Sequence, residues 1–308
     1  MKIGSRQFDL NGNHTYIMGI LNVTPDSFSD GGSYCDKDVA LKHVEEMLEN
    51  GADIIDIGGE STRPGFQKVS PSEETERVCS VISSIKERFD VPISIDSYKA
   101  CVAEEAIKSG ADVINDVWGF KLDNCSYKGY DGDENRTMAS VAVKTGVPVI
   151  LMHSARPTPE EEKKLAEEGA TIHVPASESS GVARDMKQYA DDLNKQIIEM
   201  AESAVKAGVL KENIIVDPGV GFGRTQEENL AIMKYLKDMC EAVPYPVLLG
   251  TSRKTFIGNA LDLPVNEREE GTLVTTIMAA QAGCPFVRVH DVKMNARALK
   301  MYETIINC

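Results

Sequence analysis

Eight short apolar runs, each followed by residues at helical spacing, constrain the fold of this chain more than any other feature. The runs are continuous and rich in β-branched residues, as expected of strands buried on both faces of a parallel sheet. They cover residues 17–22, 54–58, 93–96, 113–116, 147–153, 214–217, 247–250 and 286–290. Strands that alternate with helices form parallel sheets with right-handed crossovers, and about eight such units favour a closed barrel. The sequence therefore predicts an α/β fold, a (β/α)8 TIM barrel.

An open, doubly wound sheet is the main alternative fold for this pattern. Such a sheet would carry a glycine-rich phosphate loop after its first strand. No G-x-G-x-x-G or G-x-x-x-x-G-K-[ST] motif occurs there, and Gly219, Gly221 and Gly223 follow the sixth run with a different spacing. The closed barrel is therefore the better interpretation.

The start of the chain predicts a hairpin, and its length predicts a single domain. Residues 2–10 and 14–17 flank Asn11–Gly12, a strong turn signal, so we expect an N-terminal β-hairpin that plugs the bottom of the barrel. Neither an internal repeat nor a linker divides the sequence, which indicates one domain over residues 1–308.

Two stretches of the chain interrupt the alternation of strands and helices. Residues 123–137 are polar and contain glycine, and residues 155–184 are polar, acidic and only weakly patterned. Polar segments of this kind lie on protein surfaces, because buried irregular backbone would leave polar groups unpaired. We expect both stretches to be surface insertions.

Charge and cysteine content exclude several classes of protein. The net charge is −15 and no basic run occurs, which argues against a nucleic-acid partner. The seven cysteines are widely spaced without a C-x-x-C pair, so neither a disulfide framework nor a thiolate zinc site is expected. The first residues lack the apolar segment of a signal peptide, and the apolar runs are too short to cross a bilayer. We expect a cytoplasmic protein with no membrane partner.

Polar side chains occur where nearly every apolar run ends. They are Asn22, Asp56, Asp96, Asn115, Asp116, His153, Asp217, Ser252, Arg253, Lys254, Arg288 and His290. In a barrel these ends all face one mouth, where active sites are built. A single Asp after a strand is commonly a helix cap, but caps do not explain polar residues at so many strand ends. The pattern predicts an active site at the mouth.

The residues around these strand ends resemble a known family. Residues 20–32 read ILNVTPDSFSDGG, and residues 58–65 read GGESTRPG. Both resemble signatures of the dihydropteroate synthases. Shorter matches follow in the order of that family at residues 94–97, 115–117, 151–153, 217–219, 221–223, 252–254 and 288–291.

This resemblance implies a transferase of folate biosynthesis. Enzymes of the family condense 6-hydroxymethyl-7,8-dihydropterin diphosphate with p-aminobenzoate, giving 7,8-dihydropteroate and pyrophosphate. The small-molecule substrates would be the only partners apart from a second copy of the chain, since members of the family are usually homodimers. Mg²⁺ is the implied cofactor, with Asn22 as its ligand from the protein.

The pterin has a donor-rich edge, which carboxylates and an amide complement. By resemblance, Asp217 accepts the 2-amino and N3 hydrogens with help from Asn115. Asp96 faces the N1 and N8 side of the ring, and Lys254 donates to O4 and N5. The walls of the pocket are expected to come from Met152, Phe222 and Gly250.

The diphosphate and the p-aminobenzoate have their own implied residues. Arg288 and His290 are two residues apart in a strand, so both are expected on one face of it. The remaining members of this anion clamp are Asn22, Thr62 and Arg63. For p-aminobenzoate, the implied residues are Phe28 and Pro64 around the ring, and Thr255 at a helix start for the carboxylate.

The expected mechanism is dissociative. The C9–O bond to the diphosphate breaks early, which leaves a cation delocalised over the dihydropterin, and the neutral amine then attacks. Asp96 would stabilise the cation, while Mg²⁺ and the anion clamp would stabilise the leaving group. Lys254 and Arg63 are the other expected catalytic residues. No covalent enzyme intermediate is needed.

Two other functions stay open on the sequence. A methyltetrahydrofolate corrinoid methyltransferase would share the barrel and the pterin pocket, but it needs no diphosphate clamp such as Arg63, Arg288 and His290 imply. The second is an inactive pterin-binding homologue, although every matched catalytic position is intact.

Overall fold

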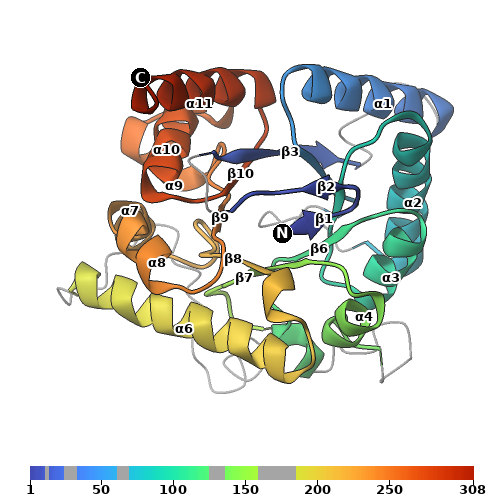
Figure 1. The fold of residues 1–308 in the computed structure, drawn as a ribbon, viewed down its shortest axis with the longest axis horizontal. Coiled ribbons are helices and arrows are strands. Elements are labelled where there is room, and N and C mark those ends of the chain that lie inside the picture. Colours follow the sequence, from blue (N-terminus) through green and yellow to red (C-terminus); the bar gives the residue numbers. More distant parts are fainter. Residues whose placement is uncertain (11–13, 24–32, 61–68, 125–135, 159–184) are drawn as a thin grey trace.

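The computed structural model describes residues 1–10, 14–23, 33–60, 69–124, 136–158 and 185–308. In this part of the chain, eight parallel strands form a ring that helices enclose (Figure 1). The strands are β3 (Tyr16–Asn22), β4 (Ile54–Gly58), β5 (Ile93–Asp96), β6 (Val113–Asp116), β7 (Val149–Met152), β8 (Ile214–Asp217), β9 (Leu248–Leu249) and β10 (Phe286–Val289). Their order around the ring is β8-β7-β6-β5-β4-β3-β10-β9. Val216 of β8 bridges Val247, next to β9, and this pairing closes the barrel that the sequence predicts.

Helices follow the strands along the chain and cover the outside of the ring (Figure 1). They are α1 (Ser33–Glu49), α2 (Pro71–Arg88), α3 (Ala100–Lys108), α4 (Met138–Thr145), α6 (Met186–Lys206), α7 (Gln226–Lys234), α8 (Leu236–Ala242), α9 (Thr255–Leu261), α10 (Glu269–Ala282) and α11 (Val292–Ile306). Short 3-10 turns occupy η2 (Lys121–Asn124), η3 (Lys211–Asn213) and η4 (Val265–Glu267). None of the described helices is both long and apolar enough to pass through a membrane.

The strands separate two apolar layers because successive side chains point to opposite faces. On β4, Ile55 and Ile57 face outward and share a cluster with Ile82 of α2. Ile54 faces inward and belongs to a second cluster inside the barrel. This is why the runs carry no polar residue at most positions: both faces of each strand are buried.

The inner apolar layer fills the half of the barrel that lies toward the amino ends of the strands. Seven strands each contribute one buried residue to it: Met18, Ile54, Val113, Ile150, Ile215, Leu248 and Phe286. Ile3 and Phe8, from the start of the chain, complete this cluster. Figure 1 shows the N-terminal strands lying across the centre of the ring, which is the position of a plug. The predicted N-terminal hairpin that closes the barrel is confirmed.

The predicted limits of that hairpin were wrong. β1 (Lys2–Ile3) pairs antiparallel with β2 (Arg6–Gln7), so the turn lies at Gly4–Ser5 and not at Asn11–Gly12. Gly4 has a φ of +56°, and a Cβ on it would lie 2.7 Å from Oδ1 of Asp112, so the turn requires glycine.

Tyr16, which was expected to pair with the first strand, belongs to the barrel instead. It lies in parallel register with Phe286 of β10. In the closed ring, the backbone of Tyr16 pairs with a neighbouring strand and is buried. A two-stranded hairpin at the surface could not bury it. Residues 11–13, and most of the predicted insertions at 123–137 and 155–184, lie outside the described residues.

Substitution of Ile3 by Ala should destabilise the barrel at the end that the N-terminal hairpin closes. Ile3 is fully buried in the inner cluster, so its truncation leaves a cavity and should lower the free energy of unfolding by about 2–5 kcal/mol. Urea denaturation of the purified variant measures this. Lys2→Ala, on the exposed neighbouring residue, is the control and should change the value by no more than about 0.5 kcal/mol. Equal midpoints for both variants would contradict the plug.

Candidate active site

The same alternation along the strands builds the site above the inner apolar layer. Two residues beyond each inner-layer residue, the side chain again points into the barrel, but now at the carboxyl end of the strand. The successive inward positions are Ile54 and Asp56, Ser94 and Asp96, Val113 and Asn115, Ile150 and Met152, Ile215 and Asp217, Leu248 and Gly250, and Phe286 and Arg288. Parallel strands bring all these ends to one mouth.

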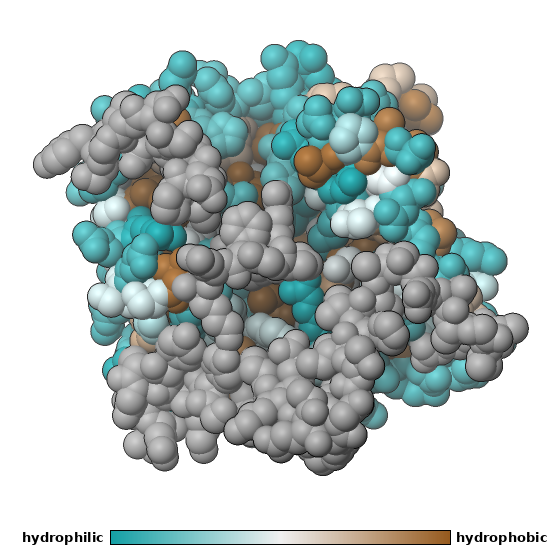
Figure 2. Space-filling model, turned by 180° about the vertical axis from the view of Figure 1, so that it is seen from behind, coloured by the Kyte–Doolittle hydropathy of each residue, from teal (hydrophilic) through white to brown (hydrophobic). Residues whose placement is uncertain are grey.

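The mouth lies on the side of the molecule opposite the plug. Figure 2 shows this side, where hydrophilic and hydrophobic residues adjoin each other near the centre. The predicted convergence of strand-end residues on one mouth is therefore what the described structure has. Phe28, Thr62, Arg63 and Pro64 lie outside the described residues.

Arg288 links two carboxylates across the barrel. Its Nε donates to Oδ2 of Asp56 at 2.5 Å, and one terminal nitrogen donates to Oδ2 of Asp96 at 2.6 Å. The side-chain amide of Asn115 also faces Asp56, 3.3 Å from each of its carboxylate oxygens. Three strands are thereby joined to β10 by one charged cluster.

Asp56 was one of the strand-end residues that the sequence placed at the mouth, but it was assigned no role there, although it holds this cluster together. It is fully buried, and both Arg288 and Asn115 bond to it. The available signal was the charge itself: a carboxylate inside an otherwise apolar run must find a partner, because an unpaired buried charge is very costly. Its role is to hold Arg288 and Asn115 in place.

Burial controls the ionisation of this cluster. It raises the pKa of the Asp96 carboxyl to about 7, against the charge of Arg288, which lowers it. Burial also acts to lower the pKa of Arg288, but the charges of Asp56 and Asp96 outweigh it and leave that pKa above its ordinary value. Oδ1 of Asp96 is buried and has no hydrogen-bond partner within the described part of the chain. A buried acceptor without a partner is costly, so this oxygen is suited to receive a hydrogen bond from a ligand.

Lys254, Asp217 and Arg288 surround the backbone of Gly250. A Cβ on Gly250 would lie 3.4 Å from Oδ2 of Asp217, 3.8 Å from Cβ of Arg288 and 4.0 Å from Nζ of Lys254. The absence of a side chain there leaves space between three functional groups.

Lys254 is held at the wall of this space. Its Nζ donates to the carbonyl of Val220 at 2.5 Å and lies 4.6 Å from the centre of the Phe222 ring. Burial lowers the pKa of Lys254 to about 8, while the charge of Asp217 opposes this. Burial likewise raises the pKa of Asp217 above its ordinary value, although Lys254 and the N–H of Gly219 partly offset it.

Arg224 is a residue that the sequence did not single out. Its guanidinium is buried and donates to the carbonyls of His153 and Pro218, at 2.9 and 2.8 Å, and to the hydroxyl of Tyr189 at 3.1 Å. The same group lies 2.9 Å from Nδ1 of His153. Burial and this cation lower the pKa of His153 to about 3, so its ring is neutral near pH 7. Arg224 thus fixes the ends of β7 and β8, which carry Met152 and Asp217.

Asn22 and His290 lie at a separate hollow beside the mouth. Both line a cavity of about 680 Å³, together with Arg253. Ser252 accepts the backbone N–H of His290 at 3.1 Å, and its hydroxyl lies 3.0 Å from Nδ1 of the ring. Since Arg288 bonds to Asp56 and Asp96, the described part of the predicted anion clamp is divided between the barrel interior and this hollow.

The strand-end residue Asp116 and the predicted helix start at Thr255 lie at local features of the backbone. Asp116 accepts the backbone N–H groups of Trp118 and Phe120, at 2.9 and 2.8 Å, and burial raises its pKa to about 7. It therefore acts as a turn cap. Thr255 is the first residue of α9 and is exposed, so the predicted helix start at this residue is confirmed.

A metal ion would find few protein ligands here. Within the described ranges, no group of three His, Cys, Asp or Glu side chains is placed to hold one. Asn22 is exposed at the end of β3, where its amide oxygen can take part in a shell completed by other ligands. Such a site suits a hard ion that keeps several waters and binds substrate oxygens.

Comparison with known proteins agrees with this geometry. The family model described as "Pterin binding enzyme" matches residues 18–290. A dihydropteroate synthase of Clostridium beijerinckii is 52% identical over 307 residues, which cover 99% of each chain.

Two solved structures extend the likeness to three dimensions. A dihydropteroate synthase of Clostridium difficile, crystallised in the presence of pteroic acid, superposes with a TM-score of 0.76 at 41% identity and covers 99% of this chain and 98% of its own. The Yersinia pestis enzyme, in a sulfonamide drug complex, gives 0.80 at 35% identity and covers 100% and 99%. With a barrel that unites Asp96, Asn115, Asp217, Lys254 and Arg288 at one mouth, this chain belongs to the dihydropteroate synthase family of pterin-binding enzymes.

Proposed function

We propose that this chain condenses 6-hydroxymethyl-7,8-dihydropterin diphosphate with p-aminobenzoate to form 7,8-dihydropteroate and pyrophosphate. The observation that carries the proposal is the convergence at the mouth of Asp217, Lys254 and Arg288 around Gly250, beside Asp96 and Asn115. Pteroic acid, with which the Clostridium difficile relative was crystallised, is a pterin joined to p-aminobenzoate.

The pterin ring enters the mouth with its polar edge toward the carboxylates. Asp217 accepts the 2-amino and N3 hydrogens, and Asn115 assists it. Asp96 offers its unpartnered Oδ1 to the other side of the ring. Lys254 donates to O4 and N5 from its position over the ring of Phe222.

The chemistry of the site favours loss of the diphosphate before attack by the amine. When both Asp56 and Asp96 are ionised, two carboxylates face one guanidinium, so this corner of the mouth is negative. A cation that develops on the dihydropterin is stabilised there, since these groups are fixed and largely shielded from water. The neutral amine of p-aminobenzoate then attacks the electron-poor carbon, and its proton leaves to solvent.

The diphosphate lies toward the cavity that Asn22 and His290 line. Arg63 and Thr62 complete its contacts, and Arg288 offers from the barrel side the guanidinium N–H groups that do not bond to Asp56 or Asp96. Asn22 would hold Mg²⁺, which would supply positive charge beside the diphosphate leaving group. For p-aminobenzoate, we assign Phe28 and Pro64 to the ring, and Thr255 to the carboxylate.

The assembly and the location of the enzyme are part of the same proposal. We assign a homodimer, for which the exposed apolar side chains of Val274 on α10 and of Met301 and Ile305 on α11 are the support.

We also assign a cytoplasmic location. Cys240 and Cys284 support it, because they are free thiols whose sulfur atoms lie only 3.4 Å apart.

The purified chain should release pyrophosphate when both substrates and Mg²⁺ are present, as a coupled phosphate assay measures. Removal of Mg²⁺ with EDTA should abolish most of this release. Asn22→Ala should raise the Mg²⁺ concentration for half-maximal rate about tenfold, the equivalent of about 1.4 kcal/mol. Folded protein that binds pterin but releases no pyrophosphate would instead be an inactive homologue.

Asp217→Ala should weaken binding of the pterin diphosphate. The loss of a charged hydrogen-bond partner costs about 1.5–3 kcal/mol, or about 10- to 150-fold in Kd. Isothermal titration calorimetry measures this directly. Asp238→Ala is the matched control, because Asp238 is exposed on α8 and pairs with Lys187. Unchanged affinity in the Asp217 variant would remove the pocket assignment.

The dependence of kcat/KM on pH should be bell-shaped with its maximum between the two active-site pKa values. Asp96 acts as a carboxylate, so activity rises as pH passes its pKa of about 7. Lys254 acts as an ammonium donor, so activity falls as pH passes its pKa of about 8. In the Asp96→Asn variant, kcat/KM should no longer rise with pH on the acid side of the profile. Its fall on the alkaline side should remain. An acid limb that persists in that variant would assign it to another group.

A further inference from the structure

Two cysteine thiols meet at the end of the barrel opposite the mouth. Cys240 lies in the last turn of α8, and Cys284 lies between the end of α10 and Phe286, the first residue of β10. Their sulfur atoms are 3.4 Å apart, although the two residues are 44 positions apart in the sequence. The contact brings α8 to the turn that leads from α10 into the barrel.

The backbone of Cys284 is held on both sides. Its N–H donates to the carbonyl of Ala279 at 2.9 Å, and its carbonyl accepts the hydroxyl of Thr15 at 3.1 Å. Gly283 makes this turn possible, because it caps α10 with a φ of +84°, a conformation that glycine adopts without strain. The position of Cys284 next to Cys240 is therefore set by the fold of the turn.

The two thiols differ in their access to solvent. Cys240 is half-buried and lines a cavity of about 320 Å³ beside Leu10, Gly283 and Pro285, whereas Cys284 is only 1% exposed. A water molecule takes up about 30 Å³ of the liquid, so a molecule as small as hydrogen peroxide can enter a cavity of this size. Such an oxidant meets Cys240 first, with the second thiol directly behind it.

Hydrogen bonding favours ionisation of the same thiol. With Cys284 as the donor, the S–H···S hydrogen bond lowers the pKa of Cys240, although burial acts against this. That hydrogen bond and burial both raise the pKa of Cys284. Because the thiolate is the nucleophilic form of cysteine, Cys240 is the more reactive thiol of the pair.

We propose that Cys240 and Cys284 are a site of reversible oxidation, at which hydrogen peroxide converts the two thiols into a disulfide that braces the fold. The reaction needs neither pterin nor p-aminobenzoate, so the inference goes beyond the proposed function. The free thiols are the reduced form, as expected in a reducing compartment, where disulfides are transient. The disulfide links α8 to the start of β10, across the segment that carries Gly250 and Lys254.

The oxidation proceeds in two balanced steps. The thiolate of Cys240 attacks one oxygen of the peroxide, the O–O bond breaks, and the departing hydroxide takes up the proton that the thiol released. This gives a sulfenic acid and water. The sulfur of Cys284 then attacks the sulfenic sulfur, the S–O bond breaks, and the leaving hydroxide takes the thiol proton to form a second water. The two sulfurs lose the two electrons that the peroxide oxygens gain, and a dithiol reductant reverses the link by exchange.

Peptide mapping of the full chain tests the site. Native protein is treated with hydrogen peroxide, the remaining thiols are alkylated, and the protein is digested with trypsin without reduction. The seven cysteines lie on different tryptic peptides, and those of Cys240 and Cys284 are residues 238–253 and 269–288. Mass spectrometry should show these two peptides joined, and dithiothreitol should separate them. Alkylation of both thiols, or a link from either one to a different cysteine, would overturn the inference.

Single variants test the order of the two steps. In Cys284→Ala, peroxide should still oxidise Cys240, and dimedone should trap its sulfenic acid. In Cys240→Ser, the buried Cys284 should remain a thiol at the same peroxide concentration. Cys79→Ser is the matched control, because Cys79 is half-buried as well but lies on α2, and the disulfide should form in it as in wild type. A sulfenic acid found on Cys284 in place of Cys240 would contradict the order.

Thermal unfolding tests the effect of the link. A covalent bond between residues 44 positions apart restricts the unfolded chain, so Tm of the oxidised protein should exceed that of the reduced protein by about 3–6 °C. Dithiothreitol should remove this increase, and Cys284→Ala should show none after the same treatment. A mapped disulfide without any rise in Tm would contradict the bracing of the fold.

Discussion

The two-residue alternation of side-chain direction along the barrel strands is the constraint on which the rest of this protein depends. On β4, Ile55 packs outward against the helices, Ile54 fills the barrel, and Asp56 reaches the mouth above it. The active site thus rests directly on an apolar layer that the N-terminal plug completes. Low hydration follows from this arrangement, and it moves the pKa values of Asp96 and Lys254 toward neutrality from opposite sides.

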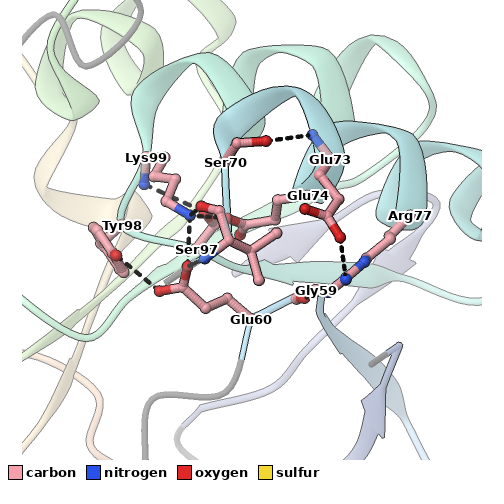
Figure 3. A network of polar contacts seen from close by, with 10 residues as sticks. Gly59, Glu60, Ser70, Glu73, Glu74, Arg77, Ser97, Tyr98 and Lys99 are labelled. Atoms are coloured by element: carbon pink, nitrogen blue, oxygen red, sulfur yellow. Dashed lines mark hydrogen bonds and ion pairs between the residues drawn. The ribbon is translucent and has the colours of Figure 1, made fainter. Parts of the chain in front are cut away.

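The β4–β5 corner repeats one electrostatic motif on two sides. At the mouth, Arg288 stands between Asp56 and Asp96; a few residues later along the same chain segments, Lys99 stands between Glu60 and Glu74. In each case one cation serves two carboxylates, so each cluster favours a further positive charge or a hydrogen-bond donor. The first cluster faces the proposed path of the reaction. The second joins the N-cap of α3 to α2 and to the residue that follows Gly59 after β4 (Figure 3).

The opposite wall of the mouth is held by different means. Arg224 bonds to carbonyls at the ends of β7 and β8, and Lys254 reaches across to the carbonyl of Val220. Carbonyls contribute no net charge, so the ammonium of Lys254 remains the principal positive group beside Asp217. The two walls therefore differ in character, one built on ion pairs and the other on backbone contacts. A ring with donors on one edge and acceptors on another matches such a site.

The sequence alone determined the barrel and the gathering of polar strand ends at one mouth, because both depend on local patterns. The runs at 54–58, 93–96, 113–116 and 214–217 coincide with β4, β5, β6 and β8, since burial on both faces selects continuous apolar residues. Polar residues at the strand ends predicted the mouth for the same reason. The hairpin was misplaced because Asn11–Gly12 is a local turn signal, whereas Tyr16 pairs with a strand 270 residues later. Only the tertiary structure decided that Asp56 would hold Arg288, 232 residues away, and that Lys99 would join Glu60 to Val69. Such partners follow from where the closed ring places each strand end, and no local pattern contains that information.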